Sequence, residues 1–161
     1  MSLKEPLIKN ISKKRLIGIR LKMSLTDNKT TDLWQSFMPR KNEIKHKLNS
    51  DFYSIQIYDS DLEFNDFTPS TFFDKWAAIA VNDFNKIPDG MESLILPEGK
   101  YAVFIHRGTP SMFHETVQYI FGNWLPNSRY QLDKRPHFEI MNQNYKPDDP
   151  DAEETVWIPI R

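Results

Sequence analysis

Pro97-Glu98-Gly99-Lys100-Tyr101-Ala102-Val103-Phe104 is the first of three blocks of sequence that decide the fold; the others are Trp124-Leu125-Pro126-Asn127-Ser128 and Phe138-Glu139. A turn that ends in Gly99 predicts the start of a strand. Pro126 predicts the end of a helix, because proline cannot continue one. The last block places a carboxylate among aromatic residues in a further strand. Together the three blocks predict a ligand pocket around one acidic side chain.

The second half of the chain has the order strand, helix, strand, strand. Alternating apolar residues predict strands over 100–107 and 137–142. The segment 111–122 is predicted to be a helix, because four apolar residues fall along one of its sides: Phe113, Val117, Ile120 and Phe121. An acidic loop over 148–154 then leads to a last strand over 156–160.

The first half follows the same order. Strands are predicted over 16–21, 52–58 and 76–81, and a polar segment over 59–70 connects the last two. A helix is predicted from about Thr31, because apolar residues recur at helical spacing, with Pro39 as a break: Leu33, Trp34, Phe37, Ile44 and Leu48.

These matching orders predict one α+β domain of 161 residues with a pseudo-two-fold arrangement. An N-terminal arm over 1–15, basic from Lys4 to Arg15, precedes a first βαββ unit over 16–90 and a second over 91–161. The expected architecture is an antiparallel sheet with helices on one face and a ligand groove on the other. Sequence identity between the two halves is too slight to prove a duplication.

Charge and composition exclude several classes of function. A formal net charge of −1 supplies no basic field for phosphates, so no direct binding of nucleic acid is expected. The absence of cysteine excludes disulfides, thiolate nucleophiles and sulfur ligands for metals. No apolar run approaches the roughly 20 residues of a membrane span, and no signal peptide is recognisable. We therefore expect a soluble, cytoplasmic protein without membrane association.

Cofactor and metal signatures are also missing. With only 5 glycines, the chain has neither a Gly-x-Gly-x-x-Gly pattern nor a Gly-rich phosphate loop. Histidines 46, 106, 114 and 137 lack the spacing of a metal site, and the acidic run over 148–154 is expected to be a solvated loop. No cofactor and no metal are predicted.

Glu139 is the sharpest candidate for a functional residue. Period-two alternation places Phe138 and Ile140 on one face of their strand and Glu139 on the other, with His137 and Met141. If the apolar pair packs on the helix, Glu139 points into the groove. The alternative is a solvated strand residue.

The same alternation sorts the strand over 52–58. One face carries Tyr53, Ile55 and Ile57, and it is the better core face. The other face places Gln56 and Tyr58 in the groove.

Further rings are candidate walls of the groove. Trp76, beside the small Ala78 and Ala80, and Trp157 in the matching strand leave room for a ligand. Tyr101, Tyr119 and Trp124 either contact the ligand or complete the core. A carboxylate in such a cavity is expected to have a raised pKa unless a cation arrives. A lipophilic cation would restore the balance through Coulomb attraction and cation–π contacts.

The three blocks, in this order and spacing, resemble the GyrI-like and AraC-type effector-binding domain family. The resemblance implies paired βαββ motifs around a site for aromatic or cationic compounds, with the family's buried acid at Glu139 and ring contacts at Tyr58, Trp76 and Trp124. It also implies a standalone member, because no DNA-binding domain is recognisable. One family tyrosine is replaced by Met141.

Three functions compete. The leading hypothesis is a protein that binds, senses or sequesters a small aromatic or lipophilic cationic compound. The second is a hydrolase of reactive small molecules in which Glu139 acts as a base with Tyr58 or Tyr101. The third is a protein-interaction module, such as a gyrase antagonist, and a homodimer or a separate regulator protein as partner also stays open. The fold alone does not choose among them.

Overall fold

The computed structural model describes residues 5–161. Its strands are β1 (Leu7–Ile11), β2 (Lys14–Met23), β3 (Phe52–Ile57), β4 (Phe73–Val81), β5 (Glu92–Leu96), β6 (Gly99–Arg107), β7 (His137–Met141) and β8 (Glu153–Pro159). Its α-helices are α1 (Thr30–Phe37), α2 (Phe113–Tyr119) and α3 (Leu125–Asn127). Short 3₁₀ segments are η1 (Met38–Glu43), η2 (Phe64–Asp66) and η3 (Pro110–Met112), and η4 (Ile120–Trp124) is a π-helical segment.

All eight strands form one antiparallel sheet in the order β1-β6-β8-β7-β3-β4-β2-β5. Within the first half the order is β2-β4-β3, and within the second half it is β6-β8-β7. Each half is therefore a βαββ unit, and the two units meet where β3 pairs with β7. The predicted α+β fold with pseudo-two-fold βαββ units is confirmed.

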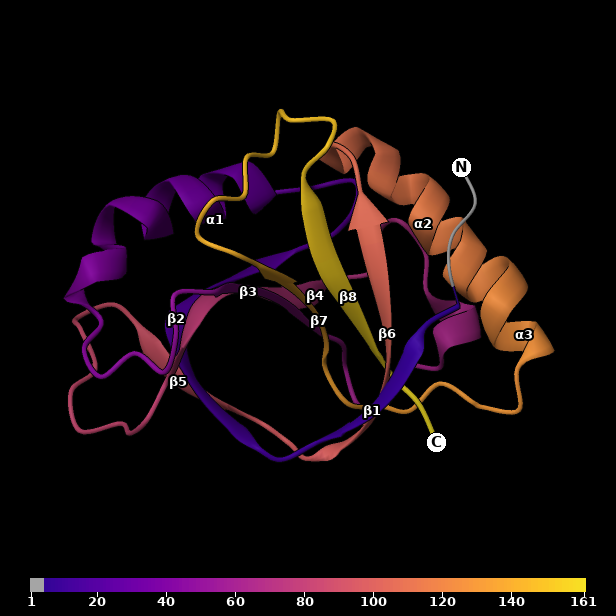
Figure 1. Ribbon diagram of the computed structural model, residues 1–161, viewed down its shortest axis with the longest axis horizontal. Coiled ribbons are helices and arrows are strands. Elements are labelled where there is room, and N and C mark those ends of the chain that lie inside the picture. Colours follow the sequence, from indigo (N-terminus) through magenta and orange to yellow (C-terminus); the bar gives the residue numbers. More distant parts are fainter. Residues whose placement is uncertain (1–4) are drawn as a thin grey trace.

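The sheet curls strongly, as the view in Figure 1 shows. Only Ser12 and Lys13 join β1, at one edge, to β2 near the other edge, so the two edges must approach each other. The interior of the curl is filled by a core of large side chains, which includes Tyr53, Ile55, Trp76, Tyr101, Phe138 and Trp157. We call this side of the sheet the inner face.

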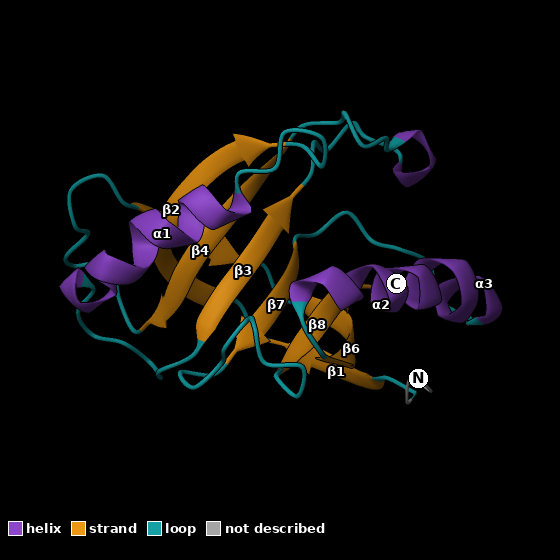
Figure 2. Cartoon of the chain, turned by 90° about the horizontal axis from the view of Figure 1, so that it is seen from above, coloured by secondary structure: helices purple, strands orange, loops and turns teal. Residues whose placement is uncertain are grey.

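Both helical segments lie on the other side, which we call the helix-bearing face. Leu33 and Phe37 of α1 pack with Ile17, Ala77 and Ile79 of the first half. Ile120 and Trp124 of η4 pack with Ala102, Phe104, Val156 and Ile158 of the second half. Figure 2 shows β3 and β7 running between these two helical segments. The centre of the helix-bearing face is thus covered by neither helix core.

Gly99 explains why the first sequence block is a turn. Its φ of +156° lies outside the range that other residues adopt easily, and the Arg135 guanidinium occupies the space of a side chain at this position. Arg135 donates hydrogen bonds to the carbonyl oxygens of Lys100 and Ile160, at 2.7 and 3.0 Å. The block therefore joins β6 to the end of the chain, and its role is structural.

Several element boundaries differ from prediction. The helix beginning near Thr31 ends at Phe37 and continues as the 3₁₀ segment η1, so Leu48 is not helical but lies in an exposed loop. Part of the predicted arm is the edge strand β1, paired with β6, whereas residues 1–4 lie outside the described residues. Strand β5 was not predicted; it pairs with the N-terminal half of β2.

Candidate functional site

Glu139 lies at the centre of the helix-bearing face. In register it faces Ser54 of β3 on one side and Val156 of β8 on the other, and Ser54 in turn faces Ala77. Because Ala77 packs under α1 and Val156 under the second helical segment, Glu139 lies between the two helix cores. Ser54 and Ala77 have small side chains, so the sheet surface beside the carboxylate carries little side-chain volume.

The Glu139 carboxylate is enclosed. The residue is 8% exposed, and its Oε1 accepts a hydrogen bond of 3.1 Å from Nε2 of Gln56. Burial raises the pKa of Glu139 to about 7; the charge of Lys75 and the Gln56 hydrogen bond lower it, and the Glu154 carboxylate raises it further. A carboxylate at this site therefore titrates near neutral pH, and its charged form lacks full compensation.

Aromatic side chains border the carboxylate toward one end of β3. The Tyr58 ring lies 5.1 Å from the His137 ring and 5.6 Å from Phe67, edge to face in both cases. Phe121 of η4 stacks on His137 at 6.2 Å and on Phe64 of η2 at 4.7 Å. Burial, and secondarily the Glu139 charge, raises the pKa of the Tyr58 hydroxyl well above its usual value, which places this ring beside the acid.

The other end of this face carries Trp34 and Phe52. Trp34 of α1 meets Phe52 of β3 edge to face at 6.2 Å, and both pack against the core beneath α1. Phe52 is opposite Met141 in register, two residues along from Glu139. Rings from both halves of the chain therefore flank the row that contains the carboxylate.

A second acid, Glu154 of β8, faces the same side of the sheet. It is opposite His106 in register, and burial raises its pKa, whereas Tyr145, His106 and Lys75 lower it. Tyr145 comes from the loop between β7 and β8, and its pKa is raised by burial and then by Glu154 and Glu139. His106 lies 2.7 Å from the Thr116 hydroxyl of α2. The end of the predicted acidic loop thus contributes a half-buried carboxylate to the site.

Three of the predicted ligand residues lie on the inner face instead. Trp76, Tyr101 and Trp157 pack inside the curl with Phe138 and Tyr53, so they do not share a face with Glu139. Tyr101 donates a hydrogen bond of 2.9 Å to the Pro136 carbonyl oxygen. The expectation that Phe138 and Ile140 pack on a helix is wrong, because both pack inside the curl. The inner face of β7 needs no helix to cover it.

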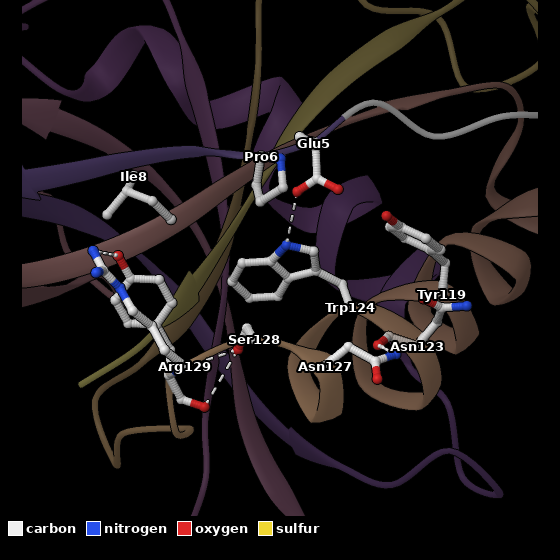
Figure 3. A pocket seen from close by; sticks show the side chains of 10 residues that line it. Glu5, Pro6, Ile8, Tyr119, Asn123, Trp124, Asn127, Ser128 and Arg129 are labelled. Carbon is white, nitrogen blue, oxygen red and sulfur yellow. Dashed lines mark hydrogen bonds between the residues drawn. The ribbon is translucent and has the colours of Figure 1, made fainter.

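Trp124 and Tyr119 line a cavity of about 350 Å³ beside the start of the described chain. Figure 3 shows the Trp124 indole beneath Glu5, and its Nε1 donates a hydrogen bond of 3.3 Å to Glu5 Oε2. Asn123, Asn127 and Arg129 complete much of the lining. A second cavity lies beside Pro39, Glu43 and Pro88. Neither cavity is lined by Glu139.

A family model for the GyrI-like small molecule binding domain matches residues 4–161. The chain belongs to the GyrI-like family. It is 28% identical over 147 residues to the transcriptional regulator BrlR of Pseudomonas aeruginosa (strain PAO1). The aligned region covers 90% of this chain and 51% of BrlR. The chain therefore spans about half the length of that curated relative.

Solved structures share the GyrI-like fold. SAV2435 bound to tetraphenylphosphonium matches with a TM-score of 0.75 at 14% identity, over 98% of this chain and 94% of that chain. The C-terminal domain of EcmrR matches with a TM-score of 0.72 at 15% identity, over 100% of this chain and 99% of that chain. At these identities the likeness shows the fold alone.

Other functional classes receive no direct support from the described residues. Residues 5–161 contain no group of three or more His, Asp or Glu side chains arranged to hold a metal ion. Among the same residues, no helix combines the length and the apolar character that crossing a bilayer requires.

Sequence reasoning missed Lys75 and Tyr145 as neighbours of this candidate site. Lys75 lies one residue before the segment predicted as a strand, and the β4 periodicity extended backward would have placed it on the same side as Ala77. Tyr145 lies in a polar loop without periodicity, so no signal in the sequence marks it.

Proposed function

We propose that this GyrI-like chain binds a lipophilic aromatic cation and that Glu139 pairs with its cationic centre. The observation that carries the proposal is the enclosed carboxylate, which is 8% exposed, accepts a hydrogen bond from Gln56 and has its pKa raised to about 7. A buried negative charge without full compensation is stabilised by an opposite charge brought next to it. A cationic ligand supplies that charge.

The surrounding rings suit the rest of such a ligand. Tyr58, Phe121 and His137 lie toward one end of the row and Trp34 and Phe52 toward the other. Aromatic faces attract cations and also pack against the aromatic groups of a ligand. SAV2435 is bound to tetraphenylphosphonium, a cation that carries phenyl rings, and this supports the choice of ligand class.

The test compares two carboxylates that both lie beside aromatic rings. Tetraphenylphosphonium is titrated by calorimetry at pH 8 into wild type, Glu139→Gln and the matched control Glu5→Gln. Loss of one charge-assisted contact is worth roughly 1.5–3 kcal/mol, so Glu139→Gln should weaken binding about ten- to hundredfold. Glu5→Gln should leave the affinity within about twofold of wild type. Equal affinities of wild type and Glu139→Gln would overturn the proposal.

The same titration has a pH signature. With a pKa of about 7, Glu139 is about one-tenth ionised at pH 6 and about nine-tenths ionised at pH 8. Tetraphenylphosphonium keeps its charge throughout, so wild type should bind it about tenfold more tightly at pH 8 than at pH 6. Glu139→Gln should show no such rise.

A catalytic role for Glu139 is the second candidate, favoured by the same pKa. A general base works best when its pKa lies near the working pH, and Glu139 meets this condition. Incubation with a strained electrophile such as an aryl epoxide, followed by mass spectrometry, tests it. Turnover that Glu139→Gln abolishes would favour the hydrolase, whereas equal turnover in the variant would exclude this role.

A further inference from the structure

Lys75 is a cationic side chain on the face of the sheet that carries this candidate site. It lies on β4, where its register neighbours are Leu21 on β2 and Gln56 on β3. Period-two alternation puts it on the same side of the sheet as Ala77, and therefore on the helix-bearing face with Glu139. Gln56, its direct neighbour, donates the hydrogen bond to Glu139.

Lys75 shares this face with both acids, because Glu154 lies on the same side of β8 as Val156, which packs under the second helical segment. Its charge lowers the pKa of Glu139 on β7 and also that of Glu154 on β8. Among the described residues, however, Lys75 forms no ion pair within 4.0 Å.

The acidic side chains near Lys75 outnumber the basic ones. Two carboxylates, Glu139 and Glu154, share the one ammonium of Lys75. The other titratable groups facing them are Tyr58 directly after β3, His137 on β7, His106 on β6 and Tyr145 in the β7–β8 loop. The tyrosine pKa values are raised and burial lowers the pKa of His137 to about 4, so these three groups are neutral at pH 7.

We propose that Lys75 determines the charge selectivity of the site, because it lies on the same face of the sheet as Glu139 and Glu154 and beside Gln56, which donates a hydrogen bond to the Glu139 carboxylate. This inference rests on the proposed function, since it assumes that Glu139 is the ligand's counter-charge. In the free protein Lys75 partly neutralises the acids and keeps them from repelling each other. A bound cation must share the carboxylates with Lys75 or push its flexible side chain aside.

Removing the ammonium should therefore strengthen cation binding. At pH 8.5, where Glu139 is largely ionised, Lys75→Met should bind tetraphenylphosphonium at least about tenfold more tightly than wild type, a change of about 1.4 kcal/mol. Methionine keeps the length and apolar stem of lysine without its charge. A dication, such as a bis-triphenylphosphonium alkane, should gain more than the monocation, because the variant leaves two carboxylates.

Tetraphenylborate is the charge-reversed probe, since it has the shape of tetraphenylphosphonium and a negative charge. Lys75→Met should weaken its binding or leave it undetectable. Lys75→Arg keeps the charge and should retain the wild-type preference. Lys22→Met is the matched control, because Lys22 is an exposed lysine that pairs with Asp74 and lies away from these acids.

A measurement without ligand tests the geometry by itself. The side-chain carboxyl carbon of Glu139 is followed by NMR from pH 5 to 9 in both proteins. Lys75→Met should move the titration midpoint of Glu139 upward, because the cation that favours its charged form is gone. Lys22→Met should leave this midpoint unchanged.

The outcomes separate the two proposals. If wild type binds tetraphenylphosphonium through Glu139 but Lys75→Met binds with the same affinity, the role of Lys75 falls and the proposed function stands. If Lys75→Met raises the affinity for tetraphenylborate as much as that for tetraphenylphosphonium, the increase comes from the apolar methionine, and the proposed role of Lys75 is overturned. An unchanged Glu139 midpoint overturns it as well. Failure of every variant to bind the cation overturns both.

Discussion

Phe138 and Glu139 are neighbours in β7, yet the two faces of the strand bury them in opposite ways. Phe138 is fully buried inside the curl, stacked on Trp157 at 5.2 Å and edge to face with Tyr101 at 5.2 Å. Glu139 is nearly as buried on the helix-bearing face, where Gln56 donates a hydrogen bond to its carboxylate. Among the ion pairs within 4.0 Å that residues 5–161 form, none involves Glu139.

The difference separates a face that stabilises the fold from the face on which we propose that the ligand binds. On the inner face, rings from both halves complement one another, and this packing favours the folded state at any pH. On the helix-bearing face, an incompletely compensated carboxylate makes stability depend on pH. A ligand that supplies the missing charge regains the stability that the free protein lacks.

Truncation on the inner face should have the largest effect. Phe138→Ala removes a fully buried ring and should lower the free energy of unfolding by roughly 3–5 kcal/mol in urea denaturation. Phe138→Leu, a milder change, should leave the affinity for tetraphenylphosphonium within about twofold of wild type. If Phe138→Leu weakens binding as much as Glu139→Gln, the ligand enters the curl and the distinction between the faces fails.

Replacing Glu139 should have a smaller effect that depends on pH. Its pKa is about 7 in the folded protein against the usual value of 4.5 for a glutamate, so the folded protein holds the extra proton, and stability falls as pH rises through this range. At pH 8 the loss amounts to about 3 kcal/mol in wild type.

Glu139→Gln removes that loss, because glutamine is neutral at every pH. Thermal unfolding at pH 5 and pH 8 should show the variant gaining stability over wild type as pH rises. Glu5→Gln, whose carboxylate is exposed, should follow wild type at both values. Parallel curves for wild type and Glu139→Gln would show that burial of this acid has little energetic consequence.

Alternation in the sequence predicted correctly which residues share a face. Gln56, Tyr58, His137 and Glu139 were grouped together, and the structure brings them together. The period of two does not say which face a helix covers, however. Because the curl buries its own inner face, Phe138 needs no helix, and the rings of Trp76 and Trp157 were assigned to the wrong side.

Contacts between distant parts of the chain could not be predicted from the sequence for a different reason. The effect of the Lys75 charge on the pKa of Glu154 depends on the order β4-β3-β7-β8, which joins the two halves and leaves no local pattern in the sequence. Trp124 was ambiguous between core and ligand contact, and it packs with Phe104 while bordering a separate cavity with Glu5. The three blocks thus predicted the family, whereas the neighbours of Glu139 from other parts of the chain, Lys75, Tyr145 and Glu154, were not predicted.

His137 should give the smallest effect of the three, with the opposite sign to Glu139. Burial lowers its pKa to about 4 from the usual 6.5 of a histidine, so between these pH values the unfolded chain binds a proton that the folded protein does not. Its contribution to stability is full above pH 6.5 and is lost as pH falls toward 4. At pH 5 the loss is about 2 kcal/mol.

His137→Gln removes this titration, and the exposed His114→Gln is the matched control. The difference in unfolding free energy between His137→Gln and wild type, measured by urea denaturation, should shift in favour of the variant by about 2 kcal/mol from pH 7 to pH 5. Comparing the difference at two pH values cancels the packing lost with the ring, which stacks on Phe121. A difference that stays constant would mean that His137 takes up its proton in the folded protein. The helix-bearing face would then be open to water at the end near Tyr58, and burial there would not be what raises the pKa of Glu139.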